Sequence, residues 1–216
     1  MGMAAREETI PFILYSNNIT ITKTFALCFR EKGGLMTLGG VDMSIHKSPI
    51  SYINFKVNSK GFFIVKLHDI LLRNPNNKIT TSINVPSSIL NDVKGVIIDS
   101  GTTDTYLPIK SKSNFVKLFY NISGIHYIAG LTTNKTKDIL HTLPSLIYKF
   151  DGPNGVIDIE RPPSTYIETT NDGFLAFRIY LKEPSGTVLG ANFMNNLNII
   201  FDIERELIGF AVSDCT

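Results

Sequence analysis

The stretch GVIIDSGTTDTYLP, residues 95–108, decides the fold and raises a question of chemistry. An apolar run leads directly into Asp99, and a carboxylate at the end of a buried strand is partly shielded from water, which makes its charge costly. Gly101 allows close approach of the backbone. Hydroxyl groups that can hold a carboxylate in one orientation come from Ser100, Thr102 and Thr103. Such a carboxylate can activate a water molecule when a partner group adjusts its pKa, although an aspartate after a strand more commonly forms a turn or a helix cap.

The totals exclude several classes of protein. The chain has 216 residues and is 43% hydrophobic, enough to build the core of one large domain. Its net charge is only +2 and no basic block stands out, so we expect no nucleic-acid partner. No apolar run approaches the roughly 18 residues of a membrane helix. The start, MGMAAREE, lacks the apolar segment of a signal peptide, and we interpret it as an artificial start or an internal cut.

Two cysteines and three glycosylation sequons bear on the cellular setting. The two cysteines, Cys28 and Cys215, are too few for a disulfide framework, and their spacing does not suit a zinc site. The residues alone therefore leave open that both are free buried thiols. Asn-x-Ser/Thr sequons begin at Asn18, Asn121 and Asn134. Together these sequons favour a protein of the secretory pathway.

The hydrophobic pattern is mostly that of strands. Alternating or β-prone runs separated by turn residues predict about ten strands, within 24–29, 35–40, 50–57, 61–72, 79–85, 95–98, 145–150, 156–168, 174–181, 187–190 and 197–212. Turns are expected at 30–34, 73–78 and 151–155, with Asp151 and Asp172 as turn residues. No linker or fixed repeat appears, so we predict one domain dominated by β-structure.

Helical spacing is confined to two short segments. Phe115, Leu118 and Phe119 predict a helix capped by Ser111 or Ser113. A second helix or turn within 136–143 is expected to stop at Pro144.

Three ordered motifs resemble the pepsin-like aspartic proteases. IIDSGTTDTYLP, residues 97–108, is similar to the second of the two active-site signatures of that family. FALCFREKGGLMTLGGVD, residues 25–42, and TVLGANFMNNLNIIFDIERELIGFAVSDC, residues 187–215, are similar to the segments that open and close the C-terminal lobe. The resemblance therefore implies a single all-β-dominated lobe of the pepsin-like fold, with a few short helices, at 25–216. It leaves 1–24 as the start of the chain followed by an inter-lobe linker or a first strand.

The resemblance also assigns roles to residues. Asp99 matches the C-terminal-lobe member of a catalytic pair of aspartates. Four neighbours match residues that support this loop or line the substrate cleft, namely Ser100, Gly101, Thr102 and Thr103. Of these, Thr102 is expected to donate a hydrogen bond to the outer oxygen of Asp99.

A second segment of the resemblance is structural. An apolar-apolar-Gly sequence, which in the family crosses the catalytic loop and fixes it, matches Val188, Leu189 and Gly190. We expect these residues to support the site and to take no part in its chemistry.

Within the family the chain is similar to the memapsin and plasmepsin V branches, which carry cysteines at positions matching Cys28 and Cys215. That likeness implies a disulfide, and closing a loop of roughly 190 residues stabilises by about 4 to 5 kcal/mol in the simple chain-entropy model. A disulfide needs an oxidising compartment, so the resemblance implies the secretory pathway. The branches further suggest a membrane anchor beyond Thr216, and the Asn-, Lys- and Ile-rich composition suits an apicomplexan source.

A pepsin-like site needs two aspartates. Two carboxylates about 3 Å apart share a proton, so one activates water while the other protonates the substrate carbonyl. No second Asp-Thr/Ser-Gly sequence occurs in the chain. We therefore expect the C-terminal half of an aspartic endopeptidase, inactive alone, which acts on a peptide or protein together with its N-terminal lobe and uses no cofactor.

Other functions are weaker readings. A homodimeric retroviral-type protease would give one aspartate per chain, but such chains are about half as long. A non-catalytic binding or inhibitor relative on the same lobe is the second alternative. Ser100 has no evident partners for a serine hydrolase triad. The histidines stand apart from one another in sequence, so we expect no metal site; they are His46, His68, His126 and His141.

Overall fold

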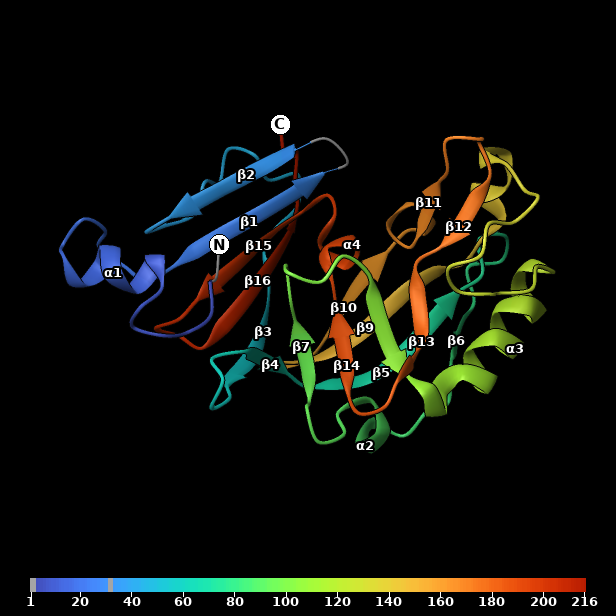
Figure 1. Ribbon diagram of the computed structural model, residues 1–216, viewed down its shortest axis with the longest axis horizontal. Helices are drawn as coiled ribbons and strands as arrows, with labels where there is room; N and C mark the ends of the chain where they lie inside the picture. The colour runs from blue at the N-terminus through green and yellow to red at the C-terminus, as the bar shows by residue number, and fades with distance from the viewer. Residues whose placement is uncertain (1–2, 31–32) are drawn as a thin grey trace.

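Ten strands join into one long sheet that runs through the whole molecule in the computed structural model, which describes residues 3–30 and 33–216 (Figure 1). In spatial order these strands are β13 (Ile179–Glu183), β8 (Thr105–Pro108), β14 (Thr187–Leu189), β7 (Val96–Ile98), β4 (Phe63–Val65), β3 (Ser51–Val57), β16 (Leu207–Val212), β15 (Leu197–Asp202), β1 (Phe25–Arg30) and β2 (Gly33–Leu38).

Two smaller sheets and short helices complete the architecture. The four-stranded sheet has the order β10 (Gly155–Arg161), β9 (Ser145–Gly152), β5 (Leu67–Arg73) and β6 (Thr80–Ser82), and the two-stranded sheet pairs β11 (Ile167–Thr169) with β12 (Leu175–Phe177). The α-helices are α1 (Ile10–Ser16), α2 (Ser87–Leu90), α3 (Lys112–Ser123) and α4 (Ala191–Met194). The 3₁₀ helices are η1 (Ile109–Ser111), η2 (Lys137–Thr142) and η3 (Pro163–Thr165). The expected all-β-dominated fold with a few short helices is confirmed.

One crossing in the long sheet gives the lobe its distinctive topology. Strand β14 lies between β7 and β8, running parallel to β7 and antiparallel to β8. Val188 at its centre is opposite Ile97 on one side and Tyr106 on the other. A late strand of the chain is thereby inserted between the two strands that flank residues 99–104, which we call the Asp99 loop.

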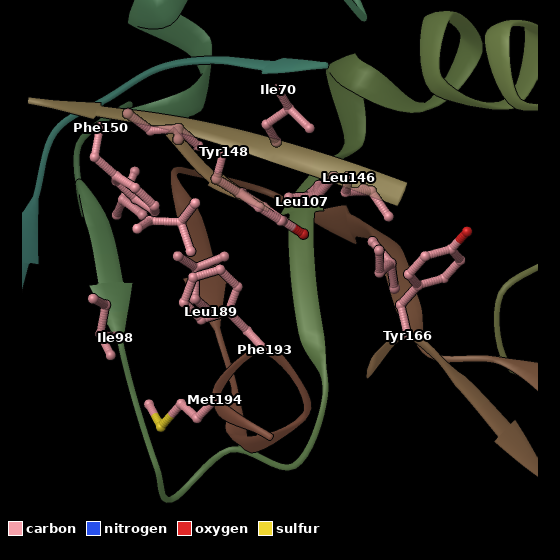
Figure 2. Close-up of a cluster of buried hydrophobic side chains, with 14 of the residues drawn as sticks. Ile70, Ile98, Leu107, Leu146, Tyr148, Phe150, Tyr166, Leu189, Phe193 and Met194 are labelled. Carbon is pink, nitrogen blue, oxygen red and sulfur yellow. The ribbon is translucent and has the colours of Figure 1, made fainter. Parts of the chain in front are cut away.

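The main core fills the space between the long sheet and the four-stranded sheet. Figure 2 shows Tyr148 and Phe150 of β9 facing Leu189 and Phe193, and the ring of Phe193 meets the Tyr148 ring edge-on with centroids 5.0 Å apart. Because Leu189 is fully buried, the strand that crosses beside the Asp99 loop is anchored in this core.

An aromatic cluster holds α3 against the sheets. Phe115 and Phe119 are fully buried, and the Phe119 ring contacts the rings of Tyr127 and Phe177 at centroid separations of 5.0 and 5.5 Å. The apolar spacing therefore predicted this helix and its buried face. Ser111 occupies the residue before the helix, but its hydroxyl donates to the Pro108 carbonyl oxygen and does not cap the helix.

Other local expectations need adjustment. Residues 3–24, expected to hold a linker or a first strand, contain helix α1 as their regular element. The turn expected at 30–34 includes residues 31 and 32, which lie outside the described part of the chain. Asp151 lies within strand β9 and not in the turn that follows, whereas Asp172 is in a turn as expected. Among the described residues, no helix is long and apolar enough to span a membrane.

A disulfide between Cys28 and Cys215 closes the lobe and confirms the pairing that the resemblance implied, against the free-thiol reading. Cys28 lies on β1, and Cys215 follows β16, at a sequence separation of 187. Both residues are buried among the strands that they join. The bond thus ties the beginning of the lobe to its end.

Replacing both cysteines by serine, or reducing the bond, is expected to lower the free energy of unfolding by about 2 to 5 kcal/mol, because the unfolded chain regains the freedom of a long loop. Urea denaturation followed by tyrosine fluorescence, with and without reductant, measures the change. An unfolding midpoint that does not move on reduction would contradict this role.

Candidate active site

Asp99 lies directly after β7, at the point where this strand ends and the Asp99 loop begins. Its backbone N–H donates to the Leu189 carbonyl oxygen at 3.0 Å, which continues the pairing of β7 with β14 by one residue. Val96 and Ile98 of β7 are buried. The apolar run before Asp99 therefore anchors the strand, and the inserted strand fixes the point at which the carboxylate leaves the sheet.

Two donors from the loop hold the Asp99 carboxylate. The backbone N–H of Gly101 donates to Oδ1 at 2.9 Å, and the hydroxyl of Thr102 donates to Oδ2 at 2.7 Å. A Cβ atom on residue 101 would lie 3.1 Å from Oδ1, so glycine permits this tight approach. Asp99 is half-buried, and among the described residues its carboxylate has no further side-chain partner.

Backbone hydrogen bonds from the start of α4 hold the Asp99 loop in place. The backbone N–H groups of Ala191 and Asn192 donate to the carbonyl oxygens of Thr102 and Thr103 at 2.7 and 3.0 Å. Gly190 passes so close that a Cβ atom there would lie 2.3 Å from the Asp104 carbonyl oxygen. Only glycine fits this crossing without moving the loop.

Asn192 is a positioning residue that the sequence analysis missed. Its side-chain oxygen accepts a hydrogen bond from the Thr105 hydroxyl at 2.8 Å, and its amide donates to the Arg178 carbonyl oxygen at 3.0 Å. These contacts tie α4 to both β8 and the segment before β13. The only signal in the sequence was an amide side chain within an otherwise apolar segment.

A groove of about 1110 Å³ opens beside the Asp99 loop. Thr103 and Asp104 of the Asp99 loop form part of its lining. The lining also includes Ile167, Glu168, Arg178, Ala191, Asn192, Asn195 and Asn196. Glu168 and Arg178 form an ion pair within it. Burial raises the pKa of the Asp104 carboxyl, and the charge of Arg178 offsets part of that increase. The structure therefore places an open groove of mixed polar and apolar lining next to the Asp99 loop.

Comparison with known proteins agrees with this geometry. A family model described as eukaryotic aspartyl protease matches residues 3–213. The chain belongs to the eukaryotic aspartyl protease family.

Relatives come from several branches of this protease family. The chain is 23% identical to Aspartic proteinase 3 of Saccharomyces cerevisiae, over 97% of this chain and 36% of the relative. It is 23% identical to Secreted aspartic protease 4 of Candida albicans, over 94% and 46%. It is 25% identical to Plasmepsin IV of Plasmodium falciparum (isolate 3D7), over 88% and 38%. The chain thus spans less than half the length of these relatives, and the similar identities single out no branch.

The structure brings the residues singled out in the sequence together in one place. Val188 and Leu189 pair with β7, and Gly190 passes directly beside the Asp99 loop. Ser100 is exposed, and its hydroxyl forms no hydrogen bond with the described residues. Thr103 is among the residues that line the groove.

The histidines lie apart from this aspartyl protease loop. His68 contacts Asp151 at 3.1 Å, and His46 contacts Asn198 at 2.9 Å. Within residues 3–30 and 33–216, no three histidine, cysteine or acidic side chains converge as ligands for a metal ion.

Gly190→Ala is expected to lower the free energy of unfolding by about 1 to 3 kcal/mol, because the new methyl group overlaps the carbonyl oxygens of the Asp99 loop. Chemical denaturation measures this. Gly40→Ala is the matched control, because nothing lies within 4 Å of a Cβ atom there. Equal stability of the two variants would show that the crossing does not hold the loop.

Proposed function

We propose that this chain is the C-terminal lobe of an aspartic endopeptidase, that it needs an N-terminal lobe from the rest of the protein, and that it is inactive alone. Family membership supports peptide hydrolysis as the activity. The match to less than half of each relative supports the assignment to one lobe.

The observation that carries the proposal is the state of Asp99. Its carboxylate is half-buried, held by two short hydrogen bonds, and has no second carboxylate among its described hydrogen-bond or ion-pair partners. A turn-forming or helix-capping aspartate would use its oxygens on the backbone of the following helix or turn alone. Here a hydroxyl from Thr102 fixes the second oxygen, which leaves the carboxylate oriented as one half of a pair.

In the proposed enzyme, Asp99 faces an aspartate of the other lobe, and the pair holds one proton. The ionised member takes a proton from a bound water as the water attacks the peptide carbonyl, and the protonated member donates to the carbonyl oxygen. The peptide lies extended in the groove beside Thr103 and Asp104. No covalent intermediate or cofactor is needed for these proton transfers.

The edge of the long sheet that lies away from the Asp99 loop offers a surface for the partner lobe. Strand β2 is the last strand of that sheet, and within residues 3–30 and 33–216 it pairs with β1 alone. It exposes Leu35 and Met36, and the neighbouring N-terminal segment exposes Ile19 and Ile21. An unpaired edge with apolar side chains is a ready template for another strand. We propose that the N-terminal lobe covers this edge.

We also propose a secretory location. The support is the disulfide between Cys28 and Cys215, which persists in oxidising compartments. The same cysteine pair is the reason to place the chain near the memapsin and plasmepsin V branches, and the Asn-, Lys- and Ile-rich composition is the reason to suggest an apicomplexan source.

Asp99→Asn in the complete two-lobe protein is expected to reduce peptide hydrolysis at least about 100-fold, because an amide cannot accept the proton of water. Cleavage of a quenched fluorescent peptide measures this, and Asp172→Asn, a change in an exposed turn, serves as the control. The isolated chain is expected to show no turnover. Hydrolysis by the isolated chain that Asp99→Asn removes would instead support a site shared between two copies.

Amide hydrogen exchange tests the proposed partner surface. Amides of β2 are expected to exchange at least about 10-fold faster in the isolated chain than in the complete protein, because pairing with a new strand protects them. Amides of β15, in the interior of the same sheet, should exchange alike in both. Equal exchange of β2 in the two proteins would place the partner elsewhere.

A further inference from the structure

Helix α3 carries a second, outward face that the core does not use. Phe115 and Phe119 lie on its buried face. Residues at helical spacing on another face line a surface groove, namely Lys112, Ser113, Val116, Lys117 and Tyr120. This helix therefore presents a continuous surface to whatever approaches from outside.

The segments that flank α3 add to this open groove, whose volume is about 590 Å³. Ile109 and Lys110 of η1 belong to the lining, as does His126, whose ring stacks on the Tyr120 ring at 4.4 Å between centroids. The floor is apolar, yet Ile109 is 55% exposed and Tyr120 is 43% exposed. Exposed bulky apolar side chains around a hollow are typical of a site that another molecule covers.

The charge on the rim has one sign. Lys110, Lys112 and Lys117 line the groove, and its lining contains no acidic side chain. None of these lysines forms an ion pair with an acidic group of residues 3–30 or 33–216. An apolar floor below three uncompensated ammonium groups complements a partner that presents apolar and acidic side chains together.

The groove also lies away from the surface assigned to the partner lobe. In Figure 1, α3 occupies one end of the long axis of the molecule, and α1 and the adjoining end of β2 occupy the other. The contact proposed between the partner lobe and β2 therefore lies at the other end of the molecule from α3.

We infer that the α3 groove is a docking site for an acidic amphipathic segment of a partner protein. An apolar side chain of that segment enters between Ile109, Val116 and Tyr120, and its carboxylates pair with the surrounding lysines. This inference does not rest on the proposed protease function, because the α3 groove shares no residue with the Asp99 loop or the groove beside it.

Two other occupants fit the surface less well. A second copy of the chain, packed about a two-fold axis, would bring the same lysines against one another, and like charges oppose such an interface. An anionic membrane also attracts lysines, but the lining holds three of them, fewer than the roughly four to eight clustered basic residues of a typical lipid-binding patch.

The probe for the test is a phage-displayed library of random 12-residue peptides, selected on the disulfide-bonded chain. The most enriched peptide is then labelled, and its dissociation constant is measured by fluorescence anisotropy. We expect enriched peptides to combine acidic and bulky apolar residues. Lys112→Glu with Lys117→Glu should weaken binding at least about 10-fold, as should Ile109→Ser, whose side chain is largely exposed.

The matched control is Lys56→Glu with Lys60→Glu, an equal change of charge at exposed positions outside the groove. It should leave the dissociation constant within about 2-fold, in keeping with a screened long-range effect. Equal weakening by both double variants would show non-specific attraction and overturn the inference. So would failure to enrich acidic peptides, binding to phosphatidylserine vesicles without peptide binding, or self-association that Ile109→Ser removes.

Discussion

The insertion of β14 between β7 and β8 is the constraint on which the site depends. A strand from a distant part of the chain meets two neighbouring strands there, and the carbonyl oxygen of Leu189 accepts a hydrogen bond from the backbone N–H of Asp99. Gly190 then passes against the carbonyl oxygens of the Asp99 loop, with no room for a side chain. Backbone contacts of this kind define the position of a carboxylate more tightly than side-chain packing does, because they leave no rotamer freedom.

The rest of the lobe keeps that crossing in place. Leu189 and Phe193, on either side of Gly190, belong to the core shared with the four-stranded sheet (Figure 2). Asn192 adds hydrogen bonds to β8 and to the segment before β13. The disulfide joins the first strand of the lobe to the residues after the last one. The chemistry of one carboxylate is therefore supported by contacts that extend across the whole lobe, as preorganised sites require.

The sequence predicted the parts of this arrangement that depend on local order. The apolar run before Asp99 predicted a buried strand ending in a carboxylate, and the spacing of Phe115 and Phe119 predicted α3. The pairing of Cys28 with Cys215 followed only from the family likeness, because two cysteines at this distance carry no local signal. Helix α1 was missed because a seven-residue helix is too short for a clear periodic pattern. Asn192 was missed because its contacts join residues far apart in the chain.

The central claim is that Asp99 is one of two facing aspartates, the other supplied by a part of the protein outside this chain. A crystal structure of the complete protein, determined at the pH of its activity, tests this claim most directly. The account predicts a second aspartate from the other lobe with a carboxylate oxygen about 3 Å from an oxygen of Asp99. An Asp99 carboxylate that faces only solvent, or is paired with a lysine or arginine in that structure, would contradict it.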